Sequence, residues 1–151
     1  MAESTERTKA AKLGTWGRWA LFWTLFVGLG ALLGWGMMLF APEFFGMTPL
    51  LAEMQGLPFA DVFFTSLVWP AFFLLIFNGL TQLTAAGLIL ARHRLACWAV
   101  LGCAVILLGW IGLQFVIFAL NPITTVYGLF ALAELVSALL WRRSLKAQHP
   151  R

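Results

Sequence analysis

The sequence predicts an all-α protein, an antiparallel bundle of four transmembrane helices with both termini on the cytoplasmic side. Two observations carry this prediction: long apolar runs, and basic residues confined to one side of them. Of the 151 residues, 62% are hydrophobic and only 11% are charged, and the mean hydropathy is +0.89. A soluble domain is about one quarter charged. Too few ionised groups are present to cover a water-facing surface, so lipid is expected to cover the protein.

Four apolar runs are each near the roughly 20 residues that a helix needs to cross about 30 Å of hydrocarbon. They are continuous and do not alternate as barrel strands do, which predicts helices. The expected spans are about 16–40, 62–90, 95–120 and 123–141. With the extracytoplasmic link 41–61 they form one transmembrane domain, 16–141, between a cytoplasmic segment, 1–15, and a cytoplasmic tail, 142–151. The first run is too long for a signal peptide and no cleavage site follows it, so it is expected to be retained.

Basic residues indicate the orientation, because they collect on the cytoplasmic side of a multi-pass protein. They precede the first span, fill the link between the second and third, and follow the fourth. They are Arg7, Lys9, Lys12, Arg18, Arg92, Arg94, Arg142, Arg143, Lys146 and Arg151. The only charges in the two other links are Glu43, Glu53 and Asp61. This distribution places both termini inside, and its short separate clusters argue against nucleic-acid binding.

The link 41–61 contains three prolines and two glycines, which argue against one long helix. Its many apolar residues argue against a freely solvated loop. A short amphipathic segment on the outer face of the bundle is expected, either as a connector resting on the membrane or as a lid over a pocket. The links Arg92–Arg94 and Asn121–Pro122 are tight hairpins, with Asn121 able to cap the last helix and Pro122 at its first position.

Polar residues inside the spans are the candidate functional residues, because each is costly in lipid unless it is paired. They form an expected seam of Glu134, Asn78, Gln82, Gln114 and Tyr127, with Trp110 beside Gln114. Glu134 is expected to be protonated near mid-membrane and to pair with Asn78. The seam either holds the helices together by hydrogen bonds or lines a pocket or a proton-coupled path, and the sequence leaves both alternatives open.

Helix-packing features complete the pattern. Pro70 is expected to bend the second helix by freeing the carbonyl of Ser66. Gly30 and Gly34 form a small-xxx-small pair that permits close helix approach, within the bundle or between protomers. Cys97 and Cys103 lie roughly 9 Å apart by the helical rise, too far for a disulfide, and are expected to be packing residues.

Nothing in the sequence points to catalysis, a metal or another cofactor. His93 and His149 are isolated, and no catalytic triad, phosphate-binding loop or dinucleotide fingerprint is present. The expected function is therefore non-enzymatic: an accessory subunit of a larger membrane complex, or a protein that binds a lipid or another lipophilic small molecule. The alternative is a small proton-coupled transporter that uses Glu134, as a homodimer.

Two stretches carry a resemblance. GWIGLQFVIFALNPITTVYG, with Trp110, Gln114, Pro122 and Tyr127, and the preceding FNGLTQLTAAGLILARHR resemble small bacterial four-span membrane proteins. Together they cover the last three helices, about half of the chain, and in topology alone the chain is similar to DoxX-type proteins. The resemblance implies the bacterial cytoplasmic (inner) membrane as location and implies no activity.

Overall fold

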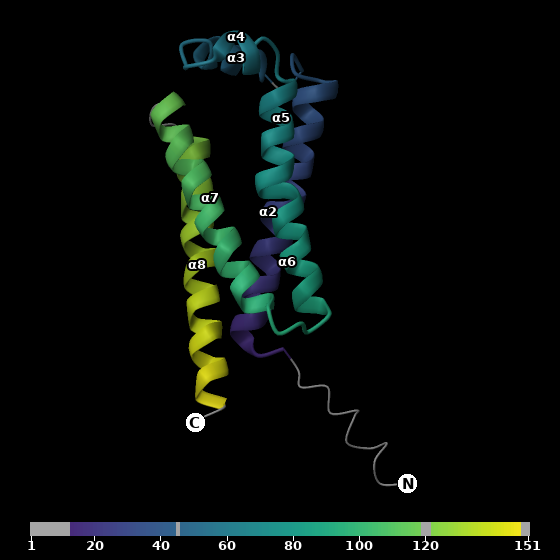
Figure 1. Ribbon diagram of the computed structural model, residues 1–151, viewed down its shortest axis with the longest axis vertical. Coiled ribbons are helices and arrows are strands. Elements are labelled where there is room, and N and C mark those ends of the chain that lie inside the picture. The colour runs from purple at the N-terminus through teal and green to yellow at the C-terminus, as the bar shows by residue number, and fades with distance from the viewer. Residues whose placement is uncertain (1–12, 45, 119–121, 149–151) are drawn as a thin grey trace.

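The computed structural model describes residues 13–44, 46–118 and 122–148, in which every regular element is a helix (Figure 1). The elements are α2 Thr15–Phe40, α3 Thr48–Met54, α4 Ala60–Phe63, α5 Val68–Leu74, the π-helical segment η1 Leu75–Leu80, α6 Thr81–Leu90, α7 Ala96–Phe118 and α8 Pro122–Gln148. Since α5, η1 and α6 form one continuous span, four helices are long and apolar enough to cross a membrane. The predicted all-α four-helix bundle is confirmed.

The four spans follow one another around the bundle. α2 packs against α8 and against all three parts of the second span, and α7 packs against α6 and α8. α2 begins and α8 ends at the same end of the bundle, which we call the termini end (Figure 1). The short helices α3 and α4 lie across the opposite end, which we call the α3 end. The link 41–61 therefore forms short helical turns over one end of the bundle, as its composition predicts.

Charged residues are divided between these two ends. Arg18, Arg92, Arg94, Arg142, Arg143 and Lys146 belong to helix termini or the hairpin at the termini end, whereas Glu43, Glu53 and Asp61 belong to the link at the α3 end. The hairpin is tight: the N–H of His93 donates to the carbonyl of Leu88 at 2.9 Å, and Arg92 adopts a left-handed φ of 53°.

The outer surface of the bundle is apolar and its interior is built from small residues. Only 22–33% of the most apolar stretch of each span is buried within the protein, so most of these residues keep some exposed surface, as lipid contact requires. At the termini end a cluster of mainly small and medium side chains, together with Trp141, fills the centre. It consists of Ala20, Ala85, Ile89, Ala96, Cys97, Val100, Cys103, Ala138 and Trp141. Both cysteines are buried and free, as the helical rise predicts.

The second span begins at Val68, not near residue 62 as the hydropathy pattern suggests. Proline explains the difference. A helix that passed through Pro70 from residue 62 would leave the carbonyl of Ser66 without its N–H partner. With the start at Val68, Pro70 instead lies in the first turn, where no N–H is needed. The N–H of Ala71 then donates to Leu67 at 2.9 Å. The expected bend of a mid-helix proline at this position is therefore wrong.

The fourth helix extends farther than predicted, because α8 continues through the basic segment to Gln148. Pro122 is its first residue, as expected, while the capping role of Asn121 lies outside the described residues. Arg142 remains close to the bundle surface, with its guanidinium carbon 4.2 Å from the centre of the Trp98 ring. This cation–π contact joins α7 to α8 at the termini end.

Candidate functional site

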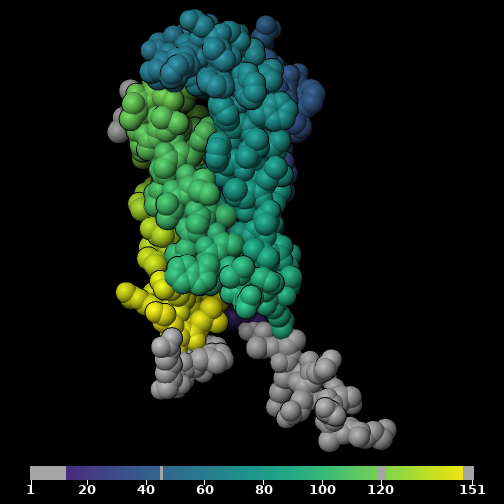
Figure 2. All heavy atoms as spheres, in the orientation of Figure 1, coloured from purple at the N-terminus to yellow at the C-terminus, as the bar shows by residue number. Residues whose placement is uncertain are grey.

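A pocket of about 670 Å³ lies toward the α3 end, between α2 on one side and α7 and α8 on the other. In Figure 2 the surface is hollowed between α7 and α5, directly beneath α3. Its walls are mainly apolar. The lining residues are Val27, Gly30, Ala31, Leu33, Gly34, Met37, Met38, Met47, Leu50, Glu53, Leu74, Asn78, Leu107, Trp110, Ile111, Gln114, Phe118, Pro122, Ile123, Thr124 and Tyr127.

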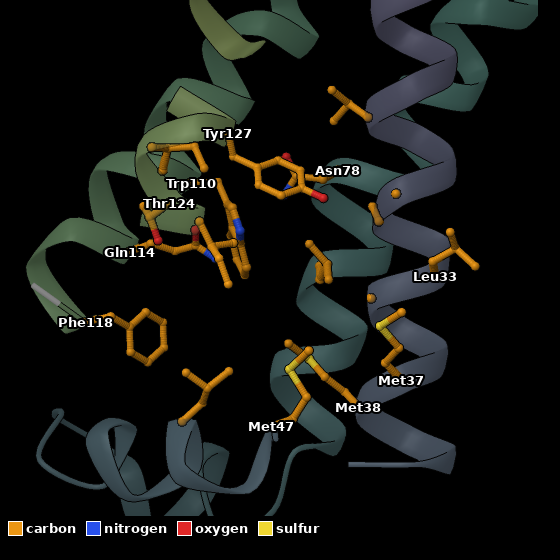
Figure 3. A pocket seen from close by; sticks show the side chains of 18 of the residues that line it. Leu33, Met37, Met38, Met47, Asn78, Trp110, Gln114, Phe118, Thr124 and Tyr127 are labelled. Atoms are coloured by element: carbon orange, nitrogen blue, oxygen red, sulfur yellow. The ribbon is translucent and has the colours of Figure 1, made fainter. Parts of the chain in front are cut away.

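The segment α3 covers the pocket. Leu50 and Glu53 of α3 line the pocket, as does Met47 directly before it, and Met54 is buried. α3 also packs against α7. Of the two alternatives that the sequence leaves open for the link, a lid over a pocket fits this arrangement. The methionines Met37 and Met38 of α2 lie on the wall opposite Trp110 and Gln114 (Figure 3). Flexible thioether chains let such a wall adapt to an irregular ligand.

Asn78 is the polar group that the pocket leaves unpaired. It lies in the π-helical segment η1, is only 2% exposed, and lines the pocket. Neither its amide nitrogen nor its amide oxygen has a hydrogen-bond partner among the described residues. π-helical turns inside α-helices occur often at functional sites. An unpaired buried amide costs about 1–3 kcal/mol, so this position is better suited to a ligand than to packing alone.

The predicted polar seam divides into two parts. Asn78, Trp110, Gln114 and Tyr127 all line the pocket, so residues from three different spans meet there. Figure 3 shows Trp110, Gln114 and Thr124 on the wall formed by α7 and α8. Glu134 and Gln82 do not line it. They form a separate pair nearer the termini end.

That pair carries a hydrogen bond across the bundle. The Gln82 Nε2 atom donates to Glu134 Oε2 at 2.9 Å, and both side chains are almost fully buried. Glu134 therefore pairs with Gln82. The sequence suggested Asn78 as its partner, and that prediction is wrong. The choice depends on a few ångströms of relative depth between two helices that are not sequence neighbours, and counting residues along each helix does not fix that. The second carboxyl oxygen of Glu134 and the amide oxygen of Gln82 have no partner among the described residues.

The predicted polar seam omits two polar residues of the pocket, Thr124 and Glu53. Thr124 is 5% exposed and lines the pocket three positions before Tyr127, which places both on one face of α8. That i, i+3 spacing is a signal that could have found it. Glu53 could not have been found, because its approach to the pocket depends on how the link folds back over the bundle.

Three glycines of α2, Gly28, Gly30 and Gly34, face other helices of the bundle. A Cβ atom on Gly34 would lie 2.9 Å from Leu74 Cδ2, and one on Gly28 would lie 3.1 Å from Leu83 and 3.2 Å from Gln82 Cβ. A Cβ on Gly30 would lie 3.5 Å from the Tyr127 hydroxyl, within the pocket. The small-residue face thus admits the second span on one side and forms part of the pocket wall on the other.

Fold and surface define the class: the chain is a multi-pass α-helical integral membrane protein. No protein-family model, curated protein or solved structure matches it. Within the described ranges, no three His, Cys, Asp or Glu side chains gather as metal ligands would. The residues that line the pocket are therefore the basis for assigning a function.

Proposed function

We propose that the protein binds a small lipophilic molecule in the pocket beneath α3. The observation that carries this proposal is the Asn78 amide, which lines an apolar cavity with both polar atoms unpaired. Its 670 Å³ falls within the roughly 300–1,000 Å³ typical of small-molecule sites. Such sites combine apolar walls with a few polar groups that orient the ligand, and Asn78, Gln114 and Tyr127 provide such groups here.

Glu134 does not line this pocket, and this favours binding over proton-coupled transport through it. Its hydrogen bond to Gln82 gives it a role in holding α8 to the second span. A transporter also needs a site that opens alternately to both sides. In contrast, the termini end of this bundle is filled by the small-residue cluster around Val100 and Ala138.

Substitution of Asn78 by leucine tests the proposal through two effects of opposite sign. Leucine has a similar shape and no polar atoms, so it should raise the stability of the ligand-free protein by about 1–3 kcal/mol. It should also abolish retention of the bound molecule. Melting temperature and native mass spectrometry in mild detergent measure the two effects on the same samples.

Thr84→Val is the matched control, because Thr84 is an exposed residue of the same span outside the pocket. This variant should retain whatever the unmodified protein retains. If Asn78→Leu also kept every bound species, Asn78 would have no part in recognition and the proposal would lose its principal support.

The location that we propose is the bacterial cytoplasmic membrane, with both termini inside and the pocket toward the outer leaflet. The separation of basic and acidic residues between the two ends supports it. A reporter fused to the C-terminus should be cytoplasmic, and a tag inserted at the exposed Gln55 should react with impermeant reagents from outside. A Gln55 site that reacted only from the cytoplasm would reverse this orientation.

A further inference from the structure

The charge of the pocket residues indicates which lipophiles the pocket takes. Among the described residues that line it, Glu53 is the only one with a charged side chain, and no lysine, arginine or histidine is among them. Glu53 is exposed on α3, at the rim of the pocket. The link that carries it contains two further carboxylates, Glu43 and Asp61, and no basic residue. Of these three carboxylates only Glu53 lines the pocket, so the charge at the rim is that of Glu53, and no basic residue of the same link compensates it.

One feature of the pocket opposes the negative potential of Glu53. The first turn of α8 lines the pocket with Pro122, Ile123 and Thr124, and a helix N-terminus attracts anions. Its dipole amounts to about half an elementary charge, against a full charge on Glu53. Pro122 also has no N–H to donate. The net preference at the rim is for a cation.

The interior can accept such a ligand. Trp110, Tyr127 and Phe118 present aromatic rings to the cavity, and ring faces attract organic cations within about 6 Å. At the deep end, the unpaired oxygen of Asn78 can accept a hydrogen bond and its unpaired nitrogen can donate one. The methionine wall suits an alkyl or cyclic hydrocarbon body.

We infer that the pocket selects lipophilic cations: molecules whose ammonium group lies beside Glu53 and whose apolar body extends toward Asn78. This inference rests on the proposed binding function and adds the class of ligand. An anionic amphiphile, such as a fatty acid, would place its carboxylate beside Glu53 and is rejected. A neutral amphiphile of the same length binds with intermediate affinity.

Three single-chain probes of similar length with a cationic, a neutral and an anionic head group test it: decyltrimethylammonium, decanol and decanoate. Each is titrated calorimetrically into the full-length protein in nanodiscs of zwitterionic lipid, with empty nanodiscs as the blank. We expect the cation to bind up to about fivefold tighter than decanol, the upper end of what an exposed ion pair contributes, and decanoate to bind weakest. Glu53→Gln should remove the preference for the cation while leaving decanol unchanged. Glu43→Gln, which removes an exposed charge outside the pocket, should preserve the preference.

Each other outcome overturns the inference. Equal affinities for all three probes, tighter binding of decanoate, or an undiminished cation preference in Glu53→Gln would contradict cation selection at this rim. In those cases the binding of decanol would still support a lipophile pocket. Failure of every probe to bind would overturn both the selectivity and the proposed function.

Discussion

Replacement of Glu134 by leucine is expected to lower the free energy of unfolding by about 1–3 kcal/mol, because the Gln82 side chain loses the hydrogen bond that it donates to Glu134 inside the bundle. Replacement by glutamine should leave stability nearly unchanged, since an amide oxygen accepts the same hydrogen bond from Gln82 Nε2. Thermal unfolding of both variants in the same detergent measures the difference.

Ser137→Ala is the control for this pair of variants. Ser137 is a buried polar residue of the same helix. Its hydroxyl donates to the backbone carbonyl of Ala133, one turn earlier in α8, at 2.7 Å. Such local bonds contribute little to packing between helices, so the alanine variant should melt close to the unmodified protein. A leucine variant at 134 as stable as Ser137→Ala would end the structural role of Glu134.

The glutamine variant also separates pairing from proton transfer. If Glu134 served only as a hydrogen-bond acceptor for Gln82, Glu134→Gln would keep every bound small molecule seen by native mass spectrometry. If it carried a proton or recognised a cation directly, the variant would fold normally and lose that activity. Glu134 lies outside the pocket lining, so we expect full retention.

Most of the fold could be predicted from hydropathy and charge, because the bilayer imposes the length and polarity of each span. The start of the second helix could not, since the run from residue 62 to Val68 contains no charged residue and only Thr65 and Ser66 as polar ones. The helix begins at Val68 because Pro70 has no N–H to donate and therefore lies in the first turn, and hydropathy carries no information about this missing donor. The π-helical turn around Asn78 has no counterpart in the hydropathy pattern either.

The candidate site was predicted in its components and not in its arrangement. Intramembrane polarity alone identified Asn78, Gln114 and Tyr127, and all three line one pocket. The same reasoning grouped Glu134 with them, although it pairs with Gln82 below the pocket. Polarity shows which residues need partners, whereas the identity of each partner depends on the rotation and depth of whole helices. The sequence offered a lid as one of two alternatives for the link and could not decide between them, since the link has several surfaces on which it could rest.

Substitution of Gly28 by leucine is expected to cost about 1–3 kcal/mol, because it overfills the contact between α2 and the second span. Gly28 is buried, and a Cβ there would meet Leu83 at 3.1 Å and the Cβ atom of Gln82 at 3.2 Å. The Gln82 atom is joined directly to the backbone and cannot move aside as the end of a flexible chain can. Displacing it would also strain the hydrogen bond to Glu134, so the loss should exceed that of a purely apolar clash.

The same change at other glycines of α2 provides the controls. A Cβ on Gly36 would meet nothing within 4 Å, and leucine there should stabilise the helix by up to about 1 kcal/mol through its higher helix propensity. Leucine at Gly34 would press on the flexible end of Leu74 and should cost less than leucine at Gly28. Leucine at Gly30 would project toward Tyr127 and should reduce ligand retention more than stability. The glycine face could serve contacts within the bundle or contacts between protomers. To decide between these roles, we would measure thermal unfolding, ligand retention by native mass spectrometry and the oligomer distribution for Gly28→Leu and the three other variants. If Gly28→Leu changed the oligomer distribution and left the melting temperature unaltered, the glycine face would serve contacts between protomers, and its assignment to the interior of the bundle would be wrong.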